Sequence, residues 1–236
     1  MSPATCIIAA AGAGDRLGAS GPKAFAPLAG EPLLVHCVRA VAACDAIDDI
    51  VVVVGRDQLA AADEAIVRAG LDSHRITVCP GGETRSQSVF RGLDACPPQA
   101  RIVAVHDAAR PLVTPGLIER AVAALADGWE AVAPGLPVVD TLKLVHGGEG
   151  AVTRTVDRAG IWAVQTPQVF AQMTLQRAHE AQDFPDVTDD LELVQRLGCK
   201  VRLVPGERRN FKVTYPEDLA LAEALLIAER KAGERG

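Results

Sequence analysis

The chain has 236 residues, of which 49% are hydrophobic and only 3% aromatic, and its formal net charge is −6. A core of Ala, Val, Leu and Ile is typical of helices packed on a parallel sheet. The acidic balance and the lack of a basic run argue against nucleic acid as a partner, and no apolar stretch approaches the ~20 residues of a membrane span.

Strand-like and helix-like segments alternate along the first 135 residues. Buried strands are predicted by apolar runs at 5–10, 49–55, 75–82, 101–111 and 129–135. Apolar residues at helical spacing predict helices at 32–44, 57–70, 83–96 and 114–128. The last of these has Thr114 as N-cap, Pro115 at its first position and Gly128 at its end. This order predicts an α/β fold with a doubly wound, mostly parallel sheet.

The pattern then changes to alternation on both sides of Gly147–Gly148. It predicts a β-hairpin over 141–156 that protrudes from the α/β body. A surface flap would explain it, but we favour an arm over 138–158 that embraces a second subunit, within a single domain of residues 1–236. Beyond the arm we expect helices at 171–182 and 187–198, a strand at 200–206 and a C-terminal helix from Pro216.

The six cysteines form no CxxC pair, and no basic segment followed by an apolar one opens the chain. This usage is typical of buried free thiols in a reducing compartment. We therefore expect a cytoplasmic protein.

Candidate binding residues follow the predicted strands, at the edge where ligands bind in open parallel sheets. They are Gly12, Gly14, Arg16, Gly18 and Lys23 after the first strand, Gly81, Gly82, Arg85 and Ser88 after the third, and His106, Asp107 and Arg110 after the fourth. Glycines let backbone N–H groups approach a phosphate, while Arg and Lys supply charge. The first loop therefore suits a polyphosphate, although a glycine-rich turn without a ligand is the alternative. The sequence of this loop fits neither the GxGxxG pattern nor the P-loop pattern.

Asp107 is a magnesium ligand or a cap, because a hard cation bound to phosphates prefers carboxylate oxygen. His106 is expected to be structural, and Asp189 and Asp190 to cap a helix. Arg158 and Lys212 are surface charges or ligands. No Ser-His-Asp or Cys-His constellation can be assembled from the spacing.

Taken together, the motifs AAGAGDRLG, GGETRSQSV, VHDAARP, TVDRAGIWAVQTPQVF and NFKVTYPEDL resemble those of 2-C-methyl-D-erythritol 4-phosphate cytidylyltransferases. The resemblance covers residues 4 to about 226. It implies a Rossmann-like nucleotidyltransferase fold, a homodimer with interlocking arms, and transfer of the cytidylyl group of CTP to methylerythritol 4-phosphate with release of pyrophosphate.

The resemblance also implies residue roles. Arg16 and Lys23 hold the triphosphate, and Arg158 and Lys212 position the substrate phosphate. The cytidine is surrounded by Ala10, Ala11, Gly12, Gly14, Gly82 and Ser88. The sugar phosphate and a divalent cation, Mg²⁺, lie near Asp107, Arg110, Thr141 and Thr188. Arg110, Thr141 and Arg158 are expected to serve the neighbouring subunit's site.

Two alternatives stay open at this point. A ribitol 5-phosphate cytidylyltransferase would share the nucleotide half and differ in its acceptor. A CTP-binding regulatory module would bind the nucleotide without turnover, although such a module has no need of a second phosphate site.

Overall fold

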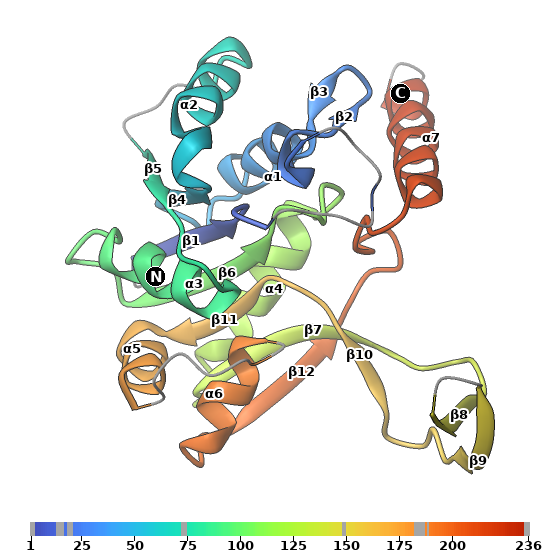
Figure 1. Ribbon diagram of the computed structural model, residues 1–236. Coiled ribbons are helices and arrows are strands. Elements are labelled where there is room, and N and C mark those ends of the chain that lie inside the picture. Colours follow the sequence, from blue (N-terminus) through green and yellow to red (C-terminus); the bar gives the residue numbers. More distant parts are fainter. Residues whose placement is uncertain are drawn as a thin grey trace.

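The computed structural model describes residues 3–12, 17, 21–71, 75–147, 150–181, 187 and 189–233. An eight-stranded sheet lies at its centre with helices on both faces, and a two-stranded hairpin stands apart from this body (Figure 1). The strand order is β10-β7-β11-β6-β1-β4-β5, and β12 pairs with β7. The sheet is mixed but mostly parallel, as the sequence predicts.

The N-terminal half forms the parallel part of the sheet. Its strands are β1 (Ala4–Ala9), β4 (Asp49–Val54), β5 (Ile76–Pro80) and β6 (Ile102–Asp107). The helices are α1 (Leu33–Ala42), α2 (Leu59–Arg68), α3 (Arg85–Asp94) and α4 (Pro115–Leu125), with short 3-10 helices at Lys23–Phe25 and Arg56–Gln58. Helices on both faces bury nearly all of β1, β4 and β6, which explains their continuous apolar runs, whereas the edge strand β5 is only partly buried. The predicted strands and helices of this half are confirmed.

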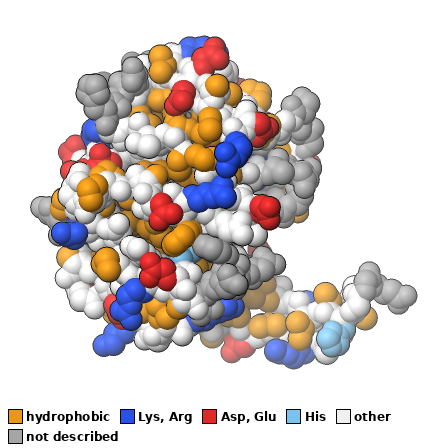
Figure 2. Space-filling model, turned by 60° about the vertical axis from the view of Figure 1, so that its left-hand side comes forward, with side chains coloured by type: hydrophobic (Ala, Val, Ile, Leu, Met, Phe, Trp, Pro, Cys, Tyr) orange, Lys and Arg blue, Asp and Glu red, His pale blue; other side chains and the backbone are white. Residues whose placement is uncertain are grey.

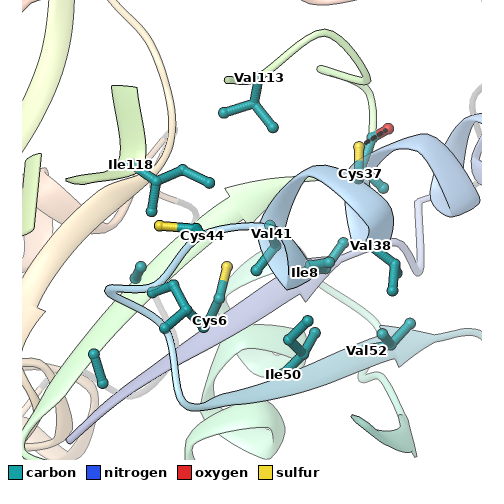
Figure 3. Packing of buried hydrophobic residues seen from close by; sticks show 14 of the residues in the cluster. Cys6, Ile8, Cys37, Val38, Val41, Cys44, Ile50, Val52, Val113 and Ile118 are labelled. Carbon is teal, nitrogen blue, oxygen red and sulfur yellow. Dashed lines mark hydrogen bonds between the residues drawn. The ribbon is translucent and has the colours of Figure 1, made fainter. Parts of the chain in front are cut away.

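Successive residues of β1 enter two different core clusters. Cys6 and Ile8 point to the face covered by α1, α2 and α4, where Figure 3 shows them beside Val38 and Val41 of α1. Ile7 points to the other face, which is covered by α3, α5 (Gln172–Ala181) and α6 (Asp190–Arg196). The period of two along a strand therefore divides one apolar run between two cores.

The C-terminal half adds β7 (Ala131–Pro137), β10 (Trp162–Val164), β11 (Gln168–Ala171) and β12 (Val201–Pro205). Strand β11 lies antiparallel between β6 and β7, and β10 pairs with the following part of β7. The Thr166–Pro167 peptide between β10 and β11 is cis. Strand β12 runs parallel to β7.

The predicted hairpin is confirmed as β8 (Leu142–His146) paired with β9 (Ala151–Val156). It forms a sheet of its own and projects from the body (Figures 1 and 2). Exposed apolar side chains line this hairpin and the segment that leads to it: Val139, Leu144, Val145 and Val152. We call residues 138–158 the arm.

The C-terminal helix α7 (Pro216–Gly233) packs over a small third core together with the short strands β2 (Pro27–Leu28) and β3 (Glu31–Pro32). The segment before α7 returns to the end of β6, where the N–H group of Val213 donates to the carbonyl of Ala109 at 2.8 Å. This return brings a late part of the chain to the edge of the parallel sheet. Among the described residues, no helix has the length and apolar character needed to cross a membrane.

Candidate active site

A cavity of about 380 Å³ lies beyond the carboxyl ends of β1, β5 and β6. Parallel strands place their carboxyl ends at one edge, so three separate loops converge there. The lining residues are Ala9, Ala10, Ala11, Gly12, Lys23, Ala24, Gly82, Glu83, Thr84, Arg85, Ser88, Asp107, Ala108, Ala109 and Lys212. Of the twelve candidate residues of these three loops, six line the cavity: Gly12, Lys23, Gly82, Arg85, Ser88 and Asp107.

The loop after β1 supplies the first wall. The N–H group of Ala10 donates to the carbonyl of Val53 at 2.8 Å, which holds the start of the loop against β4. Lys23 begins the short 3-10 helix, and the next residue, Ala24, is buried in the core. This anchor fixes the backbone that carries the Lys23 ammonium. Gly14 and Arg16, which the sequence places in the same loop, lie outside the described residues.

The loop after β5 supplies the second wall and is organised by the Ser88 hydroxyl. This hydroxyl accepts from the N–H group of Gly82 at 3.1 Å and donates to the carbonyl of Thr84 at 2.9 Å. The Thr84 side chain caps α3 by accepting from the N–H group of Gln87. A Cβ atom on Gly81 would lie 2.6 Å from the Cβ of Ala11, so the two loops touch at a point that admits no side chain.

Asp107, the last residue of β6, is the carboxylate of the site. Its Oδ2 accepts from the Lys212 ammonium at 2.8 Å, and its Oδ1 lies 3.5 Å from Nε of Arg85. Burial alone would raise the pKa of this carboxyl, but the charges of Arg85 and Lys212 outweigh it and hold the pKa well below its usual range. Asp107 is therefore an anion between two cations.

His106 is structural, as expected. Its Nε2 faces the carbonyl of Arg110 at 3.1 Å and must donate to it, so Nδ1 is the acceptor for the hydroxyl of Thr166 at 3.0 Å. The same hydroxyl accepts from the N–H group of Asp107 at 3.1 Å. Burial lowers the pKa of His106 to about 4, so the ring is neutral at pH 7. This chain of hydrogen bonds fixes the backbone of Asp107.

The remaining predicted residues lie elsewhere. Arg110 does not line the cavity, and its guanidinium donates to the carbonyls of Asn210 at 2.8 Å and Val164 at 3.4 Å. Thr141 and Arg158 are exposed on the arm, where Arg158 donates to the carbonyl of Val139. Thr188 lies outside the described residues. Within one chain, the structure does not bring Arg158 to the cavity that holds Lys23 and Lys212.

The sequence analysis did not predict the ion pair between Arg85 and Asp190. The expectation that Asp189 caps α6 is confirmed, since it accepts from the N–H group of Glu192 at 3.0 Å. The same expectation for Asp190 is wrong, because its side chain is fully buried and accepts from Arg85 at 2.7 Å. Arg85 lies in the first turn of a helix, where the helix dipole disfavours a cation. That unusual position was a signal that an anion lies nearby.

Among the described residues, no three His, Cys, Asp or Glu side chains are grouped as a protein-only metal site would require. A magnesium ion does not need such a group, because one or two carboxylates and substrate phosphates commonly hold it. Asp107 is anionic and faces the cavity, so it suits that arrangement.

The cavity combines glycine backbone, the cations Lys23, Arg85 and Lys212, and the carboxylates Glu83 and Asp107. Such a site can hold polyphosphate and stabilise charge that moves between phosphates. The sequence profile of the 2-C-methyl-D-erythritol 4-phosphate cytidylyltransferases matches residues 4–228. The chain belongs to this cytidylyltransferase family. Its members catalyse transfer of the cytidylyl group of CTP to methylerythritol 4-phosphate, and this reaction is the activity of the chain.

Relatives agree with the profile. The 2-C-methyl-D-erythritol 4-phosphate cytidylyltransferase of Streptomyces avermitilis is 47% identical over 235 residues, covering 95% of this chain and 92% of the relative. The crystal structure of the Thermus thermophilus enzyme of that name is 36% identical, with a TM-score of 0.75 and coverage of 95% and 98%.

A 4-diphosphocytidyl-2C-methyl-D-erythritol synthase structure from Anaerococcus prevotii has a TM-score of 0.82 at 29% identity, with coverage of 95% and 96%.

The family assignment decides between the alternatives that the sequence left open. The acceptor is methylerythritol 4-phosphate rather than ribitol 5-phosphate, and the chain is an enzyme rather than a regulatory module.

Proposed function

We propose that the two lysines of the cavity act on different substrates. Lys23, together with Arg16, binds the triphosphate of CTP, and Lys212 binds the phosphate of methylerythritol 4-phosphate. The observation that carries this division is the position of the two lysines. Lys23 follows the glycine loop of β1, whereas Lys212 comes from the C-terminal segment and pairs with Asp107.

In this reaction a phosphate oxygen of methylerythritol 4-phosphate attacks the α-phosphorus of CTP. A new P–O bond forms, the bond between the α-phosphorus and its bridging oxygen breaks, and pyrophosphate leaves. The attacking oxygen is already ionised, so no general base is needed. The barrier lies in bringing anions together and in carrying charge away, which positioned cations lower. This explains why the site offers lysines instead of a catalytic triad.

The cytidine is assigned to the space between the first two walls, among Ala10, Ala11, Gly12, Gly14, Gly82 and Ser88. Four of these residues line the cavity beside Ser88, whose hydroxyl holds the loop in place. A small pocket of backbone groups discriminates strongly between an amino and a keto group, because a wrong base leaves buried polar atoms unpaired. CTP is therefore preferred over UTP and ATP.

Asp107 is the residue that would hold Mg²⁺, with phosphate oxygens of the substrates completing the shell. When bound, the ion neutralises charge on the phosphates. Asp107 also holds the Lys212 ammonium, so the carboxylate links the cation of the acceptor site to the nucleotide site. The sugar phosphate is assigned to the region of Asp107, Arg110 and Thr188. The Arg110 guanidinium donates to the carbonyl of Asn210, two residues before Lys212.

The arm completes the site of a second subunit. Thr141 and Arg158 lie on the arm, which projects from its own body and exposes apolar side chains (Figure 2). Exposed apolar surface of this kind marks a protein interface. In a homodimer with exchanged arms, Arg158 of one subunit would reach the acceptor phosphate in the other. The six free cysteines are consistent with an enzyme of the reducing cytoplasm.

A pyrophosphate-release assay tests these assignments. The full chain is assayed with CTP, UTP and ATP against methylerythritol 4-phosphate and ribitol 5-phosphate, with magnesium and after treatment with EDTA. We expect turnover with CTP and methylerythritol 4-phosphate, and loss of turnover in EDTA that magnesium restores. Equal turnover with ATP would contradict the cytidine pocket, and full activity in EDTA would contradict the metal.

A further inference from the structure

Four charged side chains form an alternating row from the core to the cavity. In order they are Asp190, Arg85, Asp107 and Lys212, with contacts of 2.7, 3.5 and 2.8 Å between neighbours. They come from α6, α3, β6 and the segment before α7, so the row joins four elements that are remote in sequence. The outer three line the cavity, while Asp190 lies behind them.

Asp190 is the buried end of this row. Its side chain is fully buried, whereas that of Lys212 is 43% exposed. Its Oδ2 accepts from Arg85, its Oδ1 lies 3.5 Å from Nε2 of His179, and its backbone N–H donates to the side chain of Gln168. A carboxylate removed from water in this way is tolerated only because a cation compensates it.

The distances show how Asp190 affects Arg85. The guanidinium turns its Nη1 toward Asp190 at 2.7 Å, while its contact with Asp107 is the longer one, from Nε at 3.5 Å. The Oδ2 of Asp107 consequently accepts a hydrogen bond from the Lys212 ammonium, at 2.8 Å. An arginine without this restraint would form the bidentate pair with Asp107 that its planar fork favours, and it would then compete with Lys212.

We propose that Asp190 is a positioning residue, which acts through Arg85 to keep the Oδ2 atom of Asp107 available to Lys212. Lys212 is thereby held where it meets the phosphate of the acceptor. This inference rests on the proposed role of Lys212. Asp190 touches no substrate, and its effect reaches the reaction only through the orientation of the Arg85 guanidinium.

The primary test is Asp190→Asn, which keeps the size of the side chain and the backbone hydrogen bond to Gln168 but removes the charge. We expect the KM for methylerythritol 4-phosphate to rise about tenfold, while the Kd for CTP measured by calorimetry changes less than twofold. The matched control is Asp189→Asn on the neighbouring residue. Asparagine caps a helix as well as aspartate does, so its kinetics should stay within twofold of the parent.

A double-mutant cycle with Arg85→Gln separates positioning from a general structural role. With no guanidinium to orient, adding Asp190→Asn to Arg85→Gln should change the acceptor KM by less than twofold. An equal tenfold effect in both backgrounds would overturn the proposal. Because each single variant leaves one charge of the pair uncompensated, the double variant, which removes both, is also compared with the parent. With no guanidinium to compete for Asp107, its acceptor KM should stay within twofold of the parent, and a tenfold rise would overturn the proposal.

Lys212→Ala distinguishes this inference from the function on which it rests. If Lys212→Ala raises the acceptor KM and Asp190→Asn does not, the positioning role is wrong and the assignment of Lys212 stands. If Lys212→Ala leaves the acceptor KM unchanged, the assignment of Lys212 fails and the positioning role fails with it.

Discussion

The Lys212 ammonium lies 2.8 Å from the Oδ2 of Asp107, although 105 residues separate the two in sequence. The pair joins the end of the parallel sheet to the segment that leads into the last helix. Because Asp107 is held as an anion, it keeps the Lys212 ammonium over the cavity before substrate enters. Lys23 lies in a different loop and takes no part in this pair. Removing Lys23 and removing Lys212 should therefore change different kinetic constants.

The first prediction concerns Lys23→Ala and Lys212→Ala. If Lys23 faces the triphosphate as proposed, where charge moves during the reaction, its loss should lower kcat by roughly 10²–10³-fold, as for removal of one oxyanion donor. Lys212 meets a phosphate that enters already charged, so its loss should raise the acceptor KM and leave CTP binding nearly intact.

Steady-state kinetics with each substrate varied, combined with calorimetry of CTP binding, measure both effects. Lys200→Ala is a suitable control, since this lysine is exposed just before β12, outside both the cavity and the arm. Loss of CTP binding in Lys212→Ala, with only an acceptor effect in Lys23→Ala, would show that the two lysines are assigned to the wrong substrates.

The second prediction concerns Gly81→Ala. The added methyl group would lie 2.6 Å from the Cβ of Ala11 and 2.8 Å from the Oγ of Ser88, and neither atom is the end of a flexible side chain. The loops after β1 and β5 must then separate, and the Kd for CTP should rise at least about tenfold because the pocket loses its fixed geometry.

Gly116→Ala serves as the control for that change. A Cβ there meets only Nη1 of Arg120, at 3.8 Å, and the residue lies in the first turn of α4. Calorimetry should show unchanged CTP binding in this variant. Tight CTP binding by Gly81→Ala would place the nucleotide outside the contact between the two loops.

The third prediction tests whether the arm serves a second subunit. Lys23→Ala and Arg158→Ala are each expected to be nearly inactive. After the two are unfolded together and refolded as a mixture, half of the dimers contain one subunit of each kind. One of their two sites is then intact, so about a quarter of the parent activity should return.

Light scattering on a variant that lacks residues 141–156 provides the complementary measurement. We expect monomers with little activity, because the apolar contacts of the arm are lost and Arg158 is displaced. A dimer with normal turnover would show that the hairpin is a surface flap.

The fourth prediction concerns acid and His106. The pKa of this buried ring is about 4 in the folded protein, against 6.5 for an exposed histidine. As the pH falls below 6.5 the unfolded chain takes up the proton first, so stability is full above pH 6.5 and is lost progressively toward pH 4. The difference corresponds to about 3 kcal/mol of unfolding free energy.

Urea unfolding followed between pH 7 and pH 4 measures this loss. Burial also lowers the pKa of His36, so the parent is compared with His106→Gln, which retains His36. The variant should be less stable at pH 7 but should lose less stability on acidification. Identical pH profiles would show that His106 does not contribute to the acid sensitivity.

The parallel half of the fold could be predicted from sequence because its strands are mostly apolar runs, each followed by a segment with apolar residues at helical spacing, and Thr114 and Gly128 also mark the two ends of α4. The hairpin was equally clear, since its alternation surrounds Gly147 and Gly148. The insertion of β11 between β6 and β7 was not predictable. Strands β10 and β11 are three and four residues long, and their partners are set by packing rather than by local pattern.

The site shows the same division between local and long-range information. The loops after β1, β5 and β6 converge by the general rule for parallel sheets, so the shared position of Gly12, Lys23, Gly82, Arg85, Ser88 and Asp107 could be predicted. The partners of Arg85 could not be predicted, because Asp190 is 105 residues away in the chain and resembles an ordinary capping residue. Burial, which sequence spacing does not reveal, is what separates Asp190 from Asp189.

The strand order has a consequence for synthesis on the ribosome. Strand β6 is complete at Asp107, but its outer neighbour, β11, begins only at Gln168, roughly 60 residues later. At about 5–20 residues per second, the growing chain exposes one unpaired edge of β6 for about 3–12 s. An open edge can recruit another chain, so this interval is when a nascent enzyme is most vulnerable to aggregation. The residue at the end of that exposed edge is Asp107, and its lysine partner is translated later still.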